Sequence, residues 1–199
     1  MDGLLRLSRV IDAVNSAIGR AVSWLVLAAV LVSSVNAIVR KVFDTSSNAW
    51  LELQWVLFSA IFLLCASWTL LSNEHIRIDI VNALFPKRLR NVIDLVGHAL
   101  FLLPLTIVML VTSLPFFLAS WQIGEQSANA GGLPQWPAKS LVFIGFAFLL
   151  AQGISELIKR IAIMRGRIPD PHESVGGLHA AAEAEAERIL AAAKETESR

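Results

Sequence analysis

Four long apolar blocks constrain this sequence more than any other feature. They lie at about residues 21–39, 51–71, 93–121 and 141–158, and a helix needs about 20 such residues to cross a bilayer. None of them alternates polar and apolar residues as a barrel strand does. Because a backbone in lipid must satisfy its own hydrogen bonds, the sequence predicts an all-α, polytopic membrane protein with four transmembrane helices. The first block is longer than a signal-peptide core, so we expect it to be retained.

Composition supports this class and excludes several others. The chain of 199 residues is 55% hydrophobic and 17% charged, with a mean hydropathy of +0.62. Soluble domains are about 25% charged. The net charge of +1 provides no basic field for a nucleic-acid partner. The single cysteine, Cys65, excludes an intramolecular disulfide framework and a multi-cysteine metal cluster, and we interpret it as a small packing residue.

Lysine and arginine residues predict the orientation of the helices. Eleven of them fall in the N-terminal segment, in the loop between the second and third spans, and after the fourth span: Arg6, Arg9, Arg20, Arg77, Lys87, Arg88, Arg90, Lys159, Arg160, Arg165 and Arg167. The opposite loops hold only Arg40, Lys41 and Lys139. Both termini are therefore expected in the cytoplasm. Six tryptophans near the predicted span boundaries are typical of aromatic belts.

Two segments outside the four spans have their own character. In residues 1–20, apolar side chains recur every three or four positions and the arginines lie largely away from them. This predicts an amphipathic helix in the cytoplasmic interface, the alternative being a simple extension of the first span. Residues 161–199 are expected to form a cytoplasmic tail, Ala/Glu-rich from His179 and helical in propensity but without an apolar stripe. The transmembrane domain would then cover residues 21–160.

Side chains suited to catalysis or cofactor binding are scarce. Among the ionisable residues only His98 lies clearly inside a predicted span, and we expect it to hydrogen-bond a neighbouring helix. One intramembrane histidine does not provide paired haem ligands, and the H-E-x-x-H, G-x-S-x-G and P-loop motifs are absent from the sequence. We predict no catalytic, cofactor or metal site.

Packing features are better represented than chemical ones. Small residues line the spans: Ala29, Ser33 and Ala37 with Asn36 nearby, then Ser59, Cys65, Ala66 and Ser67, then Gly145 and Gly153. Such residues let membrane helices approach closely, in this chain or in a partner. Pro104 and Pro115 inside the third block predict a long, kinked helix.

Several short motifs together resemble a known family. They are NAIVR at 36–40, ELQW at 52–55, NEHIRID at 73–79, SLPFF with SW at 113–121, and NAGGLPQWPAKS at 129–140. Over about residues 5–165 the chain resembles the small membrane subunit, of DctQ type, of a tripartite ATP-independent periplasmic (TRAP) transporter. The sequence departs from the family pattern at one place in the second span, where family members often carry glycine and this chain has Ser59 or Cys65.

The resemblance implies a role in an assembly. In this family a periplasmic binding protein captures an organic anion, and a large membrane subunit carries the substrate and sodium sites. The small subunit packs beside the large one as a fixed scaffold in the inner membrane, and a sodium gradient drives uptake without ATP. Recognition of the substrate would lie in the other chains, so the sequence does not identify the acid.

Eight residues are candidates for contacts with these partners. They are Asn36, Arg40, Lys41, Glu52, Arg77, Asp79, Glu125 and Lys139. The small-residue surfaces of the first two spans are expected to meet the large subunit. The outer charges could dock a soluble partner, while Arg77 and Asp79 could pair with each other or with cytoplasmic loops of the partner. Two alternatives stay open: a self-associating channel or exporter, and a membrane-bound redox or catalytic subunit.

Overall fold

The computed structural model describes residues 2–45, 47–72 and 87–168 of the chain. Within these residues the regular structure is helical, apart from one isolated antiparallel bridge between Gln126 and Pro134. The chain divides into two compact units, Met1–Arg160 and Ile161–Arg199. The predicted all-α class is confirmed, while the tail from residue 169 onward lies outside the described residues.

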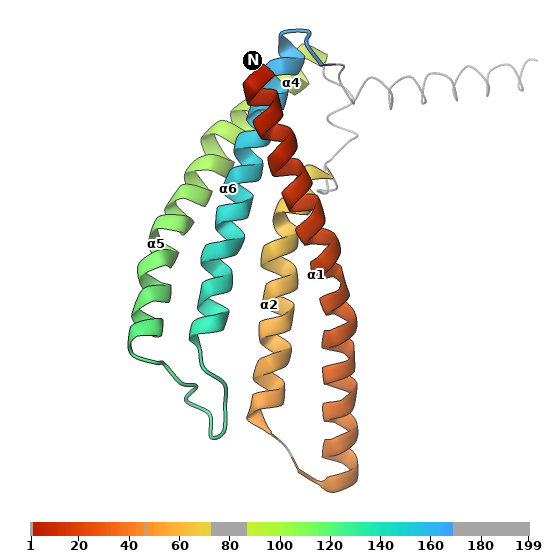
Figure 1. Ribbon diagram of the computed structural model, residues 1–199, viewed down its shortest axis with the longest axis vertical. Coiled ribbons are helices and arrows are strands. Elements are labelled where there is room, and N and C mark those ends of the chain that lie inside the picture. The colour runs from red at the N-terminus through yellow and green to blue at the C-terminus, as the bar shows by residue number, and fades with distance from the viewer. Residues whose placement is uncertain (1, 46, 73–86, 169–199) are drawn as a thin grey trace, which may run out of the picture. The chain divides into compact units, whose positions relative to one another are not determined.

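The predicted four spans are confirmed by four helical segments long and apolar enough to cross a membrane. In chain order the helices are α1 (Asp2–Phe43), α2 (Asn48–Leu71), α4 (Lys87–Gly97), the π-helical turn η1 (His98–Leu102), α5 (Leu103–Gln122) and α6 (Trp136–Met164). The third span runs through α4, η1 and α5. The connections from α1 to α2 and from α5 to α6 lie at the same end, the lower one in Figure 1. We call it the hairpin end and the other the N-terminal end.

Residues 1–20 are not a separate helix, because α1 continues through them into the first span without a break. Its 42 residues extend roughly 60 Å, about twice the thickness of a hydrocarbon core. No proline interrupts it, and Gly19 stays helical where a Cβ would lie only 2.5 Å from the Trp68 ring. The extension of the first span is thus the arrangement observed. Contact of this part of α1 with the membrane surface stays a prediction.

A π-helical turn, and not a break, precedes Pro104 in the third span. The Leu103 amide donates to the carbonyl of His98, five residues earlier, so the extra residue is absorbed before the proline. His98 Nδ1 donates to the carbonyl oxygen of Asp94 at 2.6 Å. Within the described residues the ring binds a carbonyl of its own helix, so a hydrogen bond from His98 to a neighbouring helix stays a prediction.

Glycines bring α6 close to its neighbours. A Cβ on Gly145 would lie 2.8 Å from the Leu63 Cβ and 2.9 Å from the Leu63 carbonyl oxygen, so α6 and α2 are in backbone contact there. A Cβ on Gly153 would press on the Leu102 and Leu103 side chains at 3.2 and 3.3 Å. Both glycines predicted to allow close approach therefore have their partner helices within this chain.

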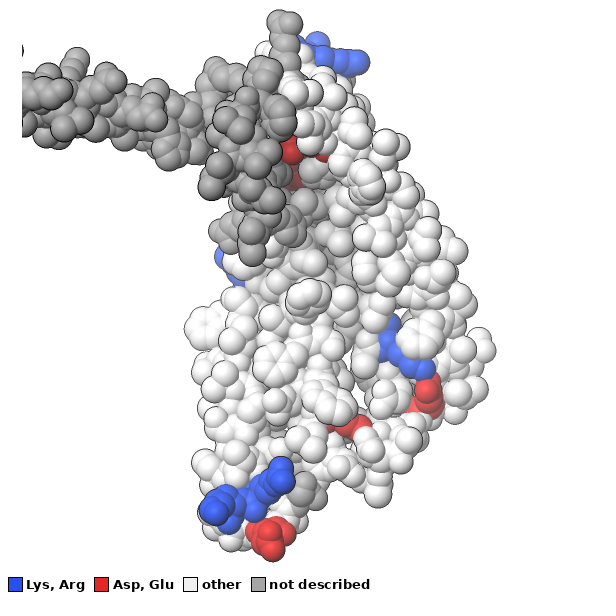
Figure 2. Space-filling view, turned by 180° about the vertical axis from the view of Figure 1, so that it is seen from behind, with Lys and Arg blue, Asp and Glu red and all other residues white. Residues whose placement is uncertain are grey.

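The described helices bury small and polar side chains and expose large apolar ones. On α5 the buried residues are Thr106, Ser113 and Ser120, whereas Leu105 and Val111 are more than half exposed. Uncharged side chains cover most of the face shown in Figure 2, where charged side chains form only small groups. This distribution suits a bundle whose helices meet lipid or other membrane proteins.

Candidate functional site

A buried carboxylate organises the hairpin end. Glu52, in the first turns of α2, is 6% exposed. Its Oε1 accepts hydrogen bonds from the Ser127 hydroxyl and from Asn129 Nδ2 at 2.9 Å, and its Oε2 accepts one from the Leu133 amide at 2.6 Å. All three donors belong to the connection between α5 and α6. Among the described residues no lysine or arginine forms an ion pair with Glu52, so neutral donors stabilise its charge.

The connection over residues 123–135, called the hairpin below, is closed by its own backbone. The Ser127 amide donates to the Leu133 carbonyl at 3.1 Å, and the Gln135 amide donates to the Glu125 carbonyl at 2.9 Å. Gly131 takes a φ of 72°, in the left-handed region where glycine carries no steric cost. The segment therefore forms a defined turn.

Gly132 lets the hairpin reach the carboxylate. A Cβ at this position would lie 2.5 Å from the Ser127 Cβ and 2.7 Å from Glu52 Oε1. No side chain fits into so small a gap without moving the hairpin or α2. Asn48, at the start of α2, adds a hydrogen bond of 3.0 Å from its Nδ2 to the Ala130 carbonyl. Two residues of α2 therefore hold the hairpin in place.

A cavity of about 440 Å³ lies between α2, the hairpin and the start of α6. Its lining includes Glu52, Trp55, Glu125, Gln126 and Gln135. Trp55 is 64% exposed beside it. The cavity is large enough for a side chain of another protein.

Glu125 and Lys139 form an ion pair at the base of the hairpin. The Lys139 ammonium also lies 4.2 Å from the centre of the Phe116 ring, a cation–π arrangement with α5. The hydrogen bond that Lys139 donates holds the pKa of the Glu125 carboxyl below its ordinary value of 4.5. Nearby, the Trp121 and Trp136 rings meet edge to face at 4.5 Å.

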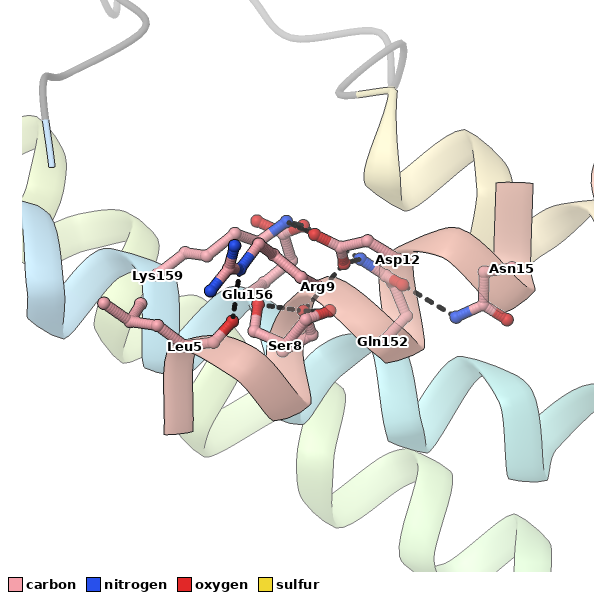
Figure 3. A network of polar contacts seen from close by, with 9 residues as sticks. Leu5, Ser8, Arg9, Asp12, Asn15, Gln152, Glu156 and Lys159 are labelled. Carbon is pink, nitrogen blue, oxygen red and sulfur yellow. Dashed lines mark hydrogen bonds and ion pairs between the residues drawn. The ribbon is translucent and has the colours of Figure 1, made fainter. Parts of the chain in front are cut away.

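A second polar cluster joins α1 to α6 at the N-terminal end (Figure 3). We call it the polar network: Ser8, Asp12 and Asn15 of α1 with Gln152, Ser155, Glu156 and Lys159 of α6. Asp12 accepts from Gln152 Nε2 at 2.9 Å, from the Ser155 hydroxyl at 2.7 Å and from Lys159 Nζ at 3.1 Å. Ser8, Asn15, Gln152 and Ser155 are at most 1% exposed. The contact between these helices is therefore made by polar side chains.

The same stretch of α6 is also tied to α4. Arg160, 6% exposed, donates from NH1 to Asn91 Oδ1 at 3.2 Å and pairs through NH2 with Asp94 Oδ2 at 2.9 Å. Lys159 and Arg160, neighbours in sequence, thus bind aspartates of two different helices: Lys159 binds Asp12 of α1, and Arg160 binds Asp94 of α4. Together these ion pairs connect three helices.

The predicted contact residues separate into groups. Arg40 and Lys41 are exposed at the end of α1, and Asn36 is half-buried one turn before them. Glu52 is buried and bound to the hairpin, and Glu125 and Lys139 bind each other. The remaining candidates, Arg77 and Asp79, lie outside the described residues. The structure thus leaves Arg40 and Lys41 as exposed charges of this set, while three others are engaged within the chain.

The polar network was missed by the sequence analysis, although a signal for it exists. Ser8, Asp12 and Asn15 recur at spacings of four and three, on a helical face directly beside the apolar series Leu4, Leu7, Ile11, Val14 and Ile18. Attention to the apolar series suggested a surface helix. The polar series was the one that packs inside the bundle.

Comparison with protein families gives one match. The family model described as "Tripartite ATP-independent periplasmic transporters, DctQ component" matches residues 29–162, two thirds of the chain. No curated protein matches the chain in a sequence comparison. The matched region contains Glu52, the hairpin, and the α4 and α6 partners of the Arg160 ion pair. With four helices able to span a membrane, this multi-pass membrane protein belongs to the DctQ component family of tripartite ATP-independent periplasmic transporters.

Proposed function

We propose that this chain is the scaffold subunit of a sodium-driven TRAP transporter that takes up an organic acid. In this role it packs against the large membrane subunit and helps to receive a periplasmic binding protein. Membership in the DctQ family is the observation that carries the proposal. The organic acid and the sodium ion would be bound by the partners.

The use of polar groups within the chain supports a scaffold role. The charged side chains of the polar network bind each other across α1 and α6, and Glu52 is occupied by the hairpin. In the described part of the chain no group of three or more histidine, cysteine, aspartate or glutamate residues is placed to hold a metal ion. Polar side chains used in this way stabilise a bundle and do not form a transport path.

The proposal places the chain in the bacterial inner membrane with both termini in the cytoplasm. The asymmetry of lysine and arginine supports this orientation, because the hairpin end carries few of them. The hairpin and the turn between α1 and α2 would then face the periplasm. Residues 1–20 would lie at the cytoplasmic interface, residues 21–160 would form the membrane domain, and residues 161–199 a cytoplasmic tail.

Two kinds of partner contact follow from this placement. Asn36, half-buried in α1, would donate a hydrogen bond to a helix of the large subunit, where an amide is favoured over lipid contact. Arg40 and Lys41, exposed at the periplasmic end of α1, would attract the binding protein electrostatically. Arg77 and Asp79 would meet cytoplasmic loops of the large subunit.

The first experiment is purification of the tagged chain from its native membrane in mild detergent, with identification of the proteins that accompany it. We expect a much larger multi-span protein in about equal amount. Asn36→Leu should lower the yield of that protein, whereas Thr112→Leu should not, because Thr112 is exposed on α5 and bonds its own helix. A homo-oligomer without a partner would contradict the proposal and favour the self-associating channel or exporter.

The second experiment tests sodium coupling and docking in proteoliposomes that contain the purified complex and its binding protein. An inward sodium gradient should drive uptake of the acid without ATP. Arg40→Gln should lower uptake at limiting concentrations of the binding protein. Arg9→Gln, a change of another exposed arginine of α1 at the opposite end, serves as the matched control and should have no effect.

A further inference from the structure

We propose that Glu52 is a positioning residue, which fixes the hairpin in the shape that the periplasmic binding protein meets. The inference rests on the proposed function and assigns a docking surface within it. Glu52 acts through the hairpin and does not touch the binding protein. The hairpin, held by α2 and by its own backbone, provides the contact.

The burial and the hydrogen bonds of Glu52 favour an action through the hairpin. The side chain is 6% exposed, and each carboxylate oxygen already accepts a hydrogen bond from the hairpin. The carboxylate is therefore engaged with the hairpin before any partner docks. The same bonds join two side chains and one backbone amide spread over residues 127–133, so one carboxylate determines the position of both strands of the hairpin.

The surface of the hairpin suits a soluble protein better than lipid. Residues 128–131 at its tip are exposed and comprise two alanines, an asparagine and a glycine. Exposed backbone groups of a turn require water or a polar partner, so the tip does not lie in hydrocarbon. Glu125, the one charged residue of the hairpin, is paired with Lys139. An uncharged surface of small residues lets a protein approach closely and recognises it by shape.

Three neighbouring features support the binding protein as the partner. The tip lies at the hairpin end together with the exposed Arg40 and Lys41, which would guide a protein of opposite charge. The cavity of about 440 Å³ beside the hairpin offers space for a side chain of that protein. A turn already fixed by Glu52, Asn48 and Gly132 loses little freedom on binding, which favours affinity.

Two variants displace the hairpin by different means. Glu52→Gln keeps one side-chain oxygen and replaces the other with an NH2 group. Because both carboxylate oxygens of Glu52 accept hydrogen bonds, the new NH2 group must face one of the hairpin's donors. In Gly132→Ala the new Cβ meets Ser127 and Glu52 at 2.5 and 2.7 Å. The matched control is Gly97→Ala, because a Cβ there has no neighbour within 4 Å.

The measurement is sodium-driven uptake by the purified complex in proteoliposomes as the binding protein is titrated. For both variants we expect the half-saturating concentration of binding protein to rise roughly tenfold, because the hairpin must now be ordered on docking. The maximal rate and the yield of the large subunit should stay close to the wild-type values. Gly97→Ala should behave like the wild type in all three measurements.

Two results would overturn the inference. One is an unchanged half-saturating concentration in both Glu52→Gln and Gly132→Ala. The other is an equal fall in maximal rate and in yield of the large subunit, which would show that Glu52 only stabilises the fold. Failure of the proposed function would instead be seen in the wild type, as purification without a large subunit or uptake independent of the binding protein.

Discussion

Polar side chains connect different structural elements at the two ends of the bundle. At the N-terminal end, ion pairs and hydrogen bonds connect helices: α1 to α6 through Asp12 and Lys159, and α6 to α4 through Arg160. At the hairpin end, the carboxylate of Glu52, which forms no ion pair with the described residues, connects a helix to a loop through neutral donors. Opposite charges hold helices side by side, whereas a carboxylate surrounded by amides and a hydroxyl gives a loop its shape.

This difference bears on how each end responds to change. A buried ion pair that loses one partner leaves a charge without compensation, which is costly for the whole bundle. A loop that loses one of several hydrogen bonds can rearrange in contact with water, and the helices need not move. We therefore expect changes at the N-terminal end to affect stability and changes at the hairpin end to affect mainly the contacts with partners.

The largest effect is expected for Arg160→Met. The change removes one partner of Asp94, from a pair of which both side chains are at least 86% buried, and such changes destabilise proteins by about 3–5 kcal/mol. The midpoint of thermal unfolding of the purified chain in detergent would measure it. Arg165→Met, an exposed control one turn later, should change the midpoint little. Equal midpoints for the two variants would contradict the importance assigned to the Arg160 pair.

A smaller loss is expected for Asp12→Ala, which removes the acceptor of three contacts from α6. Lys159 keeps its contact with Glu156, so part of the polar network survives. Since hydrogen bonds in membrane bundles contribute about 0.6 kcal/mol each, we expect a loss of about 2 kcal/mol. A double-mutant cycle with Lys159→Ala would isolate the pairwise energy. Strictly additive single losses would show that Asp12 and Lys159 do not stabilise each other.

Much of the fold could be predicted from the sequence, because membrane spans follow from length and apolar content alone. The four spans were predicted from these simple signals. The separate helix over residues 1–20 was not found, since periodicity shows which residues share a face but not which face is buried. In a bundle that meets lipid, the polar face with Ser8 and Asn15 was the inner one.

The candidate site could be predicted only in part. The sequence indicated Glu52, Glu125 and Lys139 as charges near one boundary, and the structure places all three at the hairpin end. Their partners depend on contacts between residues far apart in the chain, such as Glu52 with Leu133. No spacing rule within one segment reveals such a contact, so three residues expected to meet other proteins are instead engaged within this one.

A small effect at the hairpin end is expected for Asn48→Ala. The change removes one hydrogen bond to the Ala130 carbonyl, which is exposed and can bind water instead. The free energy of unfolding should fall by no more than about 0.5 kcal/mol, the low end of the range for such hydrogen bonds. Protease cleavage at the hairpin tip would be the more sensitive measurement and should become faster than in Gly97→Ala. Identical cleavage rates would show that Glu52 alone holds the tip.

The smallest effect is expected for Glu125→Gln, and its pH dependence gives it a signature. The pKa of Glu125 is below 4.5 in the folded chain because Lys139 donates a hydrogen bond to the charged form. A lowered pKa means that the stabilisation is present above the ordinary pKa and is lost as the pH falls through the folded value. Wild type and Glu125→Gln should therefore differ in unfolding midpoint at neutral pH and converge below about 4.5. The exposed Asp44→Asn, at the same end of the bundle, is the control. A difference that persists in acid would mean that Glu125 acts through packing and not through its charge. The Glu125–Lys139 ion pair would then not stabilise the hairpin end in the way that ion pairs stabilise the N-terminal end.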